Sequence, residues 1–175
     1  MTSIIKADNI STVSGSGNIT IPTGVNVVGT DAASIYAPGM VVNVATEHTD
    51  GNTIVSSSTY VPTGLSITYT PKKAGNLIII QSNLGADTNA GNRSIRHTIF
   101  RDTTDLGSAN GNGSATQSYD GGDRGFFPGN IIAVDSNVTA ASRVYSVRIK
   151  SGGSYSVEGD GTGARKTMIV TEIAQ

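Results

Sequence analysis

The chain has 175 residues, a net charge of −1 and a charged fraction of 14%, well below the roughly 25% of an average soluble domain. It contains no Cys, which excludes disulfides and Cys-based zinc sites, and it lacks the excess of basic residues that nucleic-acid partners require. Its apolar runs are far shorter than the roughly 20 residues of a membrane-spanning helix, and its first residues lack the apolar core of a signal peptide. We therefore expect a protein that is made in a cytoplasm and has neither nucleic acid nor membrane as a partner.

The first 35 residues are rich in Ser, Thr and Gly and contain no aromatic side chain. Short strands are predicted at 18–21 and 25–28, but the isoleucines here are too thinly spread to form a core of their own. We predict an N-terminal attachment arm, residues 1–35, that docks on another protein or on a neighbouring copy. The alternative is a first hairpin packed on the protein's own sandwich. The residues expected to dock are Ile4, Ile5, Ile10, Ile19 and Ile21.

Strand patterns fill the second predicted domain, residues 36–175. Alternation of apolar and polar residues at 65–70 places Leu65, Ile67 and Tyr69 on one face, and 143–150 alternates in the same way. Other strands are predicted at 40–45, 52–61, 76–82, 94–101, 130–135 and 167–173. The segment 76–82 contains the continuous apolar run Leu77–Ile80, which predicts a strand covered on both faces. The strand at 167–173 also has two apolar faces, with Met168 and Val170 on one and Ile169 and Ile173 on the other.

Segments rich in Gly, Asn and Pro separate these strands. Loops are predicted at 70–76, 85–92 and, as the longest, 107–125. Pro62-Thr63-Gly64 is predicted as a turn in which Gly64 takes a positive φ before a new strand starts. Many short strands joined by such turns predict an all-β fold, an antiparallel β-sandwich of jelly-roll type over roughly Met40–Gln175, with almost no helix.

No constellation of residues points to catalysis. The two histidines, His48 and His97, lie in no metal-binding motif, and His97 is expected beside Ile95 and Ile99 as a hydrogen-bonded structural residue. The segment 159–164 superficially matches a dinucleotide-binding fingerprint, but a strand rather than a helix is expected after it. We predict no enzyme, no metal and no cofactor. A carboxylate pair for glycoside hydrolysis stays open, since such pairs meet in space and not in sequence.

Acidic residues beside glycine, at 120–123 and 158–160, lack the spacing of a calcium loop and are interpreted as solvated turns. Aromatic residues beside Arg and Gly in a long loop can form a sugar- or protein-binding face. The candidate recognition residues are Tyr119, Arg124, Phe126 and Phe127. The alternative is that Phe126 and Phe127 tuck the loop onto the core.

Several phrases of the chain resemble a small group of tailed-phage virion proteins, which are usually described as virion structural or tail-fibre-like. The phrases are Ser3–Ile10, Gly15–Gly24, Val28–Asp31, Ser34–Gly39, Tyr69–Lys72 with Leu77–Ile79, and Phe100–Asp102 with Leu106–Gly107. The resemblance implies a β-sandwich head, often trimeric, with an N-terminal segment joined to the virion, and it implies no catalytic residues.

We therefore expect a non-enzymatic structural protein of a virion, assembled in the host bacterial cytoplasm, that acts as a capsid decoration (cement) protein or a short fibre. The small number of aromatic residues indicates a core partly shared between chains, and we expect a homo-oligomer, with the number three coming from the resemblance. A module that recognises host glycans through the 107–127 loop is the alternative. A glycan-cleaving enzyme is the third hypothesis.

Overall fold

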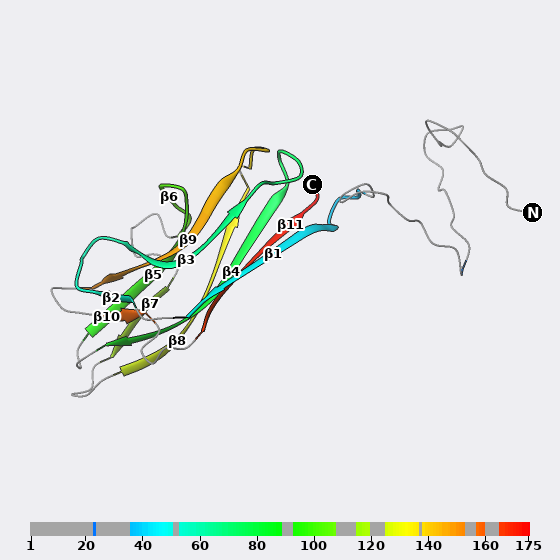
Figure 1. Cartoon of the computed structure of the whole chain (residues 1–175). Coiled ribbons are helices and arrows are strands. Elements are labelled where there is room, and N and C mark those ends of the chain that lie inside the picture. Colours follow the sequence, from blue (N-terminus) through cyan, green and yellow to red (C-terminus); the bar gives the residue numbers. More distant parts are fainter. Residues whose placement is uncertain are drawn as a thin grey trace, which may run out of the picture. The chain divides into compact units, whose positions relative to one another are not determined.

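The computed structural model (Figure 1) describes residues 23, 36–50, 53–88, 93–107, 115–119, 125–136, 138–152, 157–159 and 165–175. Contacts within the chain divide it into two units, 1–35 and 36–175, and the fold below is that of the second unit. The strands expected at 18–21 and 25–28 lie outside the described residues, as do the isoleucines expected to dock. The described ranges contain strands and turns but no helix, which confirms the prediction of an all-β protein.

Within the described ranges, eleven strands form two antiparallel sheets. In chain order they are β1 (Val41–Thr49), β2 (Thr53–Val55), β3 (Val61–Tyr69), β4 (Leu77–Thr88), β5 (Arg93–Arg101), β6 (Thr104–Asp105), β7 (Ala115–Tyr119), β8 (Gly125–Asp135), β9 (Arg143–Ser151), β10 (Val157–Gly159) and β11 (Lys166–Ile173).

Sheet A has the order β1-β11-β4-β10-β2, and β8 pairs with β4 (Figure 1). Because β8 takes one edge of β4 from Ile78 to Thr88, β11 and β10 share the other edge, β11 along 77–83 and β10 along 86–88. In the same way β1 pairs with β11 and β2 with β10. Sheet A is therefore four strand positions wide along its length, with β8 at one border and β1 and β2 at the other.

Sheet B has the order β3-β9-β5-β6, with β7 also pairing with β5. β6 pairs with the end of β5 at Phe100 and Arg101, and β7 pairs with its beginning from Arg93 to His97. This sheet is also four positions wide. The chain changes sheet after β2, β3, β4, β7, β8 and β9, so that neighbours in a sheet are mostly distant in sequence.

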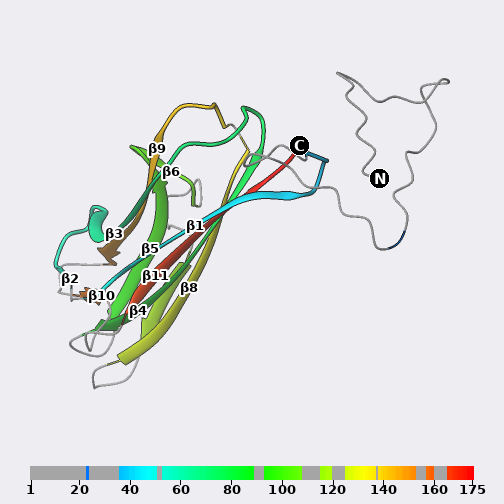
Figure 2. The ribbon, with the colours of Figure 1, turned by 45° about the vertical axis from the view of Figure 1, so that its right-hand side comes forward.

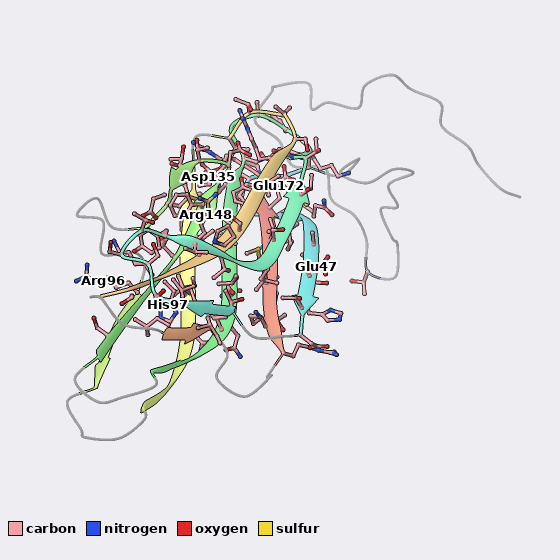
Figure 3. All side chains as sticks on the ribbon, turned by 60° about the vertical axis from the view of Figure 1, so that its left-hand side comes forward. Glu47, Arg96, His97, Asp135, Arg148 and Glu172 are labelled. Carbon is pink, nitrogen blue, oxygen red and sulfur yellow. The ribbon has the colours of Figure 1, made fainter. Side chains whose placement is uncertain are left out.

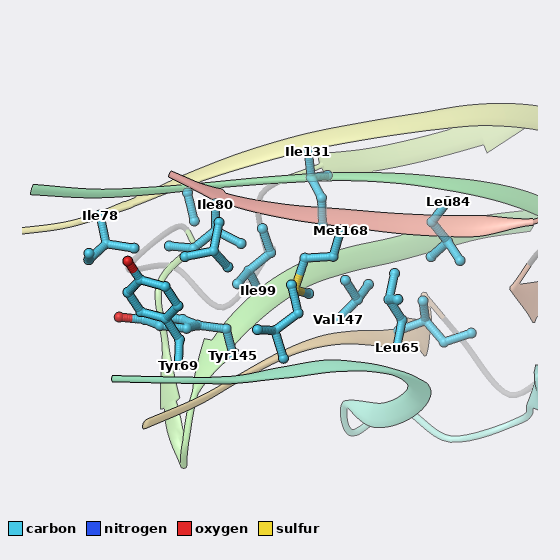
Figure 4. Packing of buried hydrophobic residues seen from close by; sticks show 14 of the residues in the cluster. Leu65, Tyr69, Ile78, Ile80, Leu84, Ile99, Ile131, Tyr145, Val147 and Met168 are labelled. Atoms are coloured by element: carbon cyan, nitrogen blue, oxygen red, sulfur yellow. The ribbon is translucent and has the colours of Figure 1, made fainter. Parts of the chain in front are cut away.

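Side chains from the two sheets meet in one apolar core (Figure 4). Leu65, Ile67 and Tyr69 of β3 point into it, as their alternation predicted. Full burial of one aliphatic side chain contributes roughly 1.5–3 kcal/mol, so this layer is the main stabilising feature of the sandwich. The completely enclosed apolar members are Ile78, Ile80, Leu84, Ile95, Ile99, Tyr145, Val147, Ile149, Met168 and Val170.

Two buried carboxylates lie at one end of this core, on the two strands that flank β4. Asp135 on β8 and Glu172 on β11 flank Ile78 of β4 in register, and both are labelled in Figure 3. Each accepts a hydrogen bond across the sandwich: Tyr145 Oη donates to Asp135 at 2.9 Å and Tyr69 Oη donates to Glu172 at 2.6 Å. Buried charges need such partners, and here the partners also join the two sheets.

Glu172 in addition fixes the loop between β3 and β4. It accepts hydrogen bonds from the backbone N–H of Lys72 at 2.9 Å and of Lys73 at 3.3 Å, and from Asn76 Nδ2 at 2.6 Å. Burial favours a higher pKa for Glu172, but these donors, together with Tyr69, outweigh burial and hold the pKa below its usual value. Asp135 has a cationic partner as well, Arg101, whose Nη1 lies 2.6 Å from a carboxylate oxygen.

Several sequence-based expectations about loops and strands are wrong. Of the strand predicted at 52–61, only β2 at Thr53–Val55 is found before β3 starts at Val61. The single loop predicted at 107–125 contains β7, and β8 begins at Gly125 rather than at Asn130. β4 continues to Thr88 through part of the loop predicted at 85–92. The turn predicted at 62–64 is an irregularity inside β3, although Gly64 does have the expected positive φ, +83°.

These differences have physical reasons. β3 and β8 are border strands, where a proline such as Pro62 or Pro128 removes no ladder hydrogen bond that the sheet needs. β7 has the sequence ATQSY, which carries no apolar alternation, and it is held in sheet B by backbone pairing with β5. Gly129 meets β4 so closely that a Cβ at this position would lie 2.2 Å from the backbone oxygen of Leu84.

Candidate contact surfaces

The outer face of sheet A is the surface that points away from the core on β1, β11, β4 and β8. The register sets its rows: Val44, Thr171, Ile79 and Val134 lie side by side across the four strands. Eight aliphatic residues with described side chains occupy this face: Val41, Val44, Leu77, Ile79, Ile132, Val134, Ile169 and Ile173. Its polar members are Thr46, His48, Gln81, Asn83, Asn130, Thr167 and Thr171.

This face is open to solvent and, over its described side chains, carries no Asp, Glu, Lys or Arg. Its outermost strands are the most exposed, with 59% of Ile132, 53% of Val134, 54% of Val41 and 53% of Val44 accessible. Antiparallel sheets usually place polar residues on the face turned to water. A contiguous apolar area on a solvent-facing sheet marks an interaction surface.

A shallow depression of about 330 Å³ lies on this face. The outward side chains of Gln81, Asn130, Ile132, Thr167 and Ile169 line it. All five are uncharged, and the amides can donate and accept hydrogen bonds at the rim of an apolar floor. The depression can receive an aliphatic or amide side chain from a partner. The residues that line it include no Asp, Glu, His, Lys or Arg.

The outer face of sheet B has the opposite character. Arg148 and Lys150 on β9 and Arg96 on β5 stand on it together with Tyr60 and Phe100. The guanidinium of Arg148 lies 4.1 Å from the centre of the Phe100 ring, and Lys150 Nζ lies 4.3 Å from the centre of the Tyr60 ring. Figure 3 labels Arg96 and Arg148. Cations held over aromatic faces have a fixed position, which lowers the entropy lost when they bind an anion.

The same aromatic residues hold each other in place. The two rings meet edge to face with their centres 5.7 Å apart. Burial and the nearby Asp105 carboxylate raise the pKa of Tyr60 to about 12, so its hydroxyl stays protonated at neutral pH. Asp105 accepts hydrogen bonds from Thr98 Oγ1 at 2.5 Å and from the backbone N–H of Gly107 at 2.9 Å. Among the described side chains of this face, the three cations outnumber the Asp105 carboxylate, which already accepts two hydrogen bonds. The surface is therefore positively charged.

His97 lies in the core and on neither outer face. It is fully buried between Ile95 and Ile99 on the inner side of β5, as the alternation predicted. The expected hydrogen bond is absent: neither ring nitrogen has a partner among the described residues. Burial lowers its pKa to about 4, so the ring is neutral near pH 7. Asp135 and Glu172 are equally enclosed, and all three groups are out of reach of a substrate.

The structure describes the backbone of three of the four predicted recognition residues, but not their side chains. Tyr119 ends β7, opposite Arg93, and Phe126 and Phe127 belong to β8, opposite Asp87 and Ala86. Their side chains and the whole of Arg124 lie outside the described residues, so their role stays a prediction. Two of these four residues therefore belong to sheet A and one to sheet B, and not to one continuous loop.

Other sequence motifs behave as expected or fall outside the described ranges. Strand β11 follows the segment 159–164, which confirms the expectation of a strand rather than a helix after it. The acidic segment 120–123 is not among the described residues. In the part of the chain that the structure describes, no group of three or more His, Asp or Glu side chains is placed to hold a metal ion. The same ranges contain no helix that is long and apolar enough to cross a membrane.

Sequence patterns alone did not reveal either outer face as a unit. Each face is assembled from strands that are far apart in the chain, and only the register brings Ile132, Ile169 and Val44 to one surface. The available signal was the apolar character of both faces of the segments 76–82 and 167–173. No protein-family model matches the chain, and no curated protein shows significant similarity to it.

Proposed function

We propose that this protein is a non-enzymatic structural component of a tailed-phage virion. In this proposal it is an oligomeric β-sandwich on the particle surface and acts as a capsid decoration (cement) protein or as a short fibre. Three finer points belong to the proposal: the sandwich is a jelly roll, the copies associate as trimers, and residues 1–35 attach the protein to other virion proteins.

The strand order is the observation that carries the proposal. Sheet A runs β1-β11-β4-β8, and β2 and β10 continue the positions of β1 and β11. Sheet B runs β3-β9-β5-β7, and β6 shares the border position of β7. The chain passes between the sheets at six of its connections. Two four-stranded sheets linked in this way support the proposed jelly roll, a double Greek key used by viral capsid domains and lectins.

The surfaces and the resemblance support the same reading. An uncharged, aliphatic sheet face suits permanent contact between subunits, whose interfaces are more apolar than ordinary surface. The buried carboxylates act as hydrogen-bond acceptors between sheets and not as groups facing a cleft. The phrases shared with tailed-phage virion proteins lie both in residues 1–39 and in the sandwich.

Particles purified from infected cells that make this protein provide the test. Mass spectrometry should find the protein in washed particles, and its copy number should match a capsid lattice for a decoration protein or a small multiple of three for a fibre. A variant lacking residues 1–35 should fold and remain oligomeric but fail to incorporate. Absence of the protein from purified particles would overturn the proposal, and normal incorporation of the shortened variant would overturn the attachment role.

A second candidate function, recognition of host glycans, is favoured by the outer face of sheet B. Arg96, Arg148 and Lys150 suit the carboxylates of acidic surface polysaccharides, because guanidinium groups bind carboxylates with two parallel hydrogen bonds. Binding of the purified protein to an array of neutral and acidic glycans tests this. Arg148→Ala should reduce binding to the acidic glycans. Equal binding by the variant, or no binding by the parent protein, would remove this candidate.

A further inference from the structure

We propose that the outer face of sheet A is the surface through which copies of this chain associate. The inference rests on the proposed oligomer and names its interface. Candidates for this role must offer apolar area, carry few charged side chains and be large enough for a stable contact. The two outer faces of the sandwich differ in apolar area and in charge.

The pattern of β4 supplies the first argument. The apolar run at 76–82 predicted a strand covered on both faces, and the structure covers only one of them. Ile78 and Ile80 are enclosed in the core, whereas Leu77 and Ile79 lie on the outer face. β11 repeats this arrangement: Val170 is enclosed and Ile169 faces outward. The two middle strands of sheet A therefore have an outward apolar side whose residues are only partly buried, by their neighbours within the sheet and not by a second layer of described residues.

Charge supplies the second argument. The centre of a subunit interface is depleted of charged residues, because each one must lose its hydration shell on contact. On the described outer face of sheet A the only titratable side chain is His48, at the β1 border. The outer face of sheet B carries Arg96, Arg148 and Lys150. A copy that docked face to face on sheet B would bring these cations toward the same cations of its partner.

Size supplies the third argument. Strands about 4.8 Å apart make a face about 19 Å wide, and the eight residues of β4 from Leu77 to Leu84, whose side chains are described, make it about 26 Å long at about 3.3 Å each. The product, about 500 Å² on each partner, gives a contact of about 1,000 Å² in total, the size at which a specific interface begins. The shape also accommodates the proposed trimer: three faces of this width around an axis stand about 5.5 Å from it, near half the roughly 10 Å spacing of packed sheets.

The test uses charged substitutions at matched exposed positions. Ile132→Lys and Val44→Lys place a charge on the outer face of sheet A, and Val144→Lys, at an exposed valine of sheet B, is the control. An unpaired charge buried in an interface costs roughly 3–5 kcal/mol, which raises the dissociation constant by about 100-fold or more. Light scattering at micromolar concentration should give an oligomer for the parent protein and the control, and a monomer for both sheet A variants. Circular dichroism checks that each variant is folded.

A second measurement introduces no charge into the interface and uses the absence of cysteine from the chain. Ile132→Cys and Val144→Cys each introduce one thiol at an exposed position. Alkylation at position 132 should be slower by about tenfold or more in the oligomer than after dilution to the monomer, while position 144 reacts equally in both.

The outcomes separate the proposed oligomer from the proposed interface on sheet A. A parent protein that is monomeric overturns the proposed oligomer and this inference together. An oligomer that persists in both sheet A variants, with fast alkylation at position 132, overturns the inference alone and leaves the oligomer standing. Dissociation by Val144→Lys would transfer the interface to sheet B.

Discussion

His97 makes the stability of this protein dependent on pH, and the size of the effect can be worked out from the structure. The imidazole is fully buried, has no hydrogen-bond partner among the described residues, and has its pKa lowered by burial to about 4. In the unfolded chain its pKa is about 6.5. The folded protein therefore resists protonation at a site that the unfolded chain protonates readily.

The sign follows from linkage. Because the folded pKa lies below the unfolded one, the stabilising contribution is fully present above pH 6.5 and is lost as the pH falls toward 4. Between pH 7 and pH 5 the loss amounts to about 2 kcal/mol. Over this range carboxylates with unfolded pKa values near 4 remain largely ionised, so the histidine dominates the slope.

Urea unfolding followed by far-UV circular dichroism at pH 7, 6 and 5 measures the effect. With a slope of about 2 kcal/mol per molar urea, the midpoint should fall by about 1 M from pH 7 to pH 5. His97→Leu should abolish most of this fall, whereas His48→Gln, at an exposed position of β1, should keep it. Equal falls in the parent protein and in His97→Leu would refute the reasoning. An NMR titration of the folded parent protein that gives His97 a pKa near 6.5 would refute it as well.

Three substitutions should lower the free energy of unfolding by amounts that the same urea method can resolve. Glu172→Ala leaves buried donors such as the Tyr69 hydroxyl without an acceptor and should lower the free energy of unfolding by about 4 kcal/mol. A loss below about 1 kcal/mol would contradict the hydrogen bonds described for Glu172. Gly64→Ala has open space around the new methyl group but must adopt a φ of +83°, so a loss of about 1–2 kcal/mol in the free energy of unfolding is expected. No loss would show that the backbone there relaxes. Gly129→Ala brings a Cβ to within 2.2 Å of the backbone oxygen of Leu84, so a cost of about 3 kcal/mol is expected, and a parent-like midpoint would contradict the close approach of β4 and β8.

The sequence predicted well those strands that have one apolar and one polar face. The segments 65–70 and 143–150 show a period of two because water on one side and the core on the other select alternate residues. The same principle placed His97 with Ile95 and Ile99. β7 and the first residues of β8 were missed because backbone pairing, not side-chain pattern, holds a border strand in a sheet.

The surfaces were harder to predict than the strands. Tyr60 precedes β3, whereas Phe100 lies on β5 and Arg148 on β9, and nothing in their spacing shows that a cation will lie over a ring. The hydrogen bond from Tyr69 to Glu172 joins residues 103 positions apart. Register decides such meetings, and a single sequence does not contain the register of strands that pair across most of its length.

The position of β11 has a consequence for how the protein is made. The last strand of the chain lies between β1 and β4 in sheet A, so β1 has no neighbour in that sheet until β11 exists; Figure 2 shows the three strands together. More than a hundred residues separate β1 from β11, which takes roughly 5–25 s at a synthesis rate of about 5–20 residues per second. Sheet A therefore closes only after β11 has been translated. A product that stops before Lys166 lacks this middle strand, and the neighbouring edges of β1 and β4 have no partner between them. Synthesis through β11 is in this way a precondition for the folded sandwich.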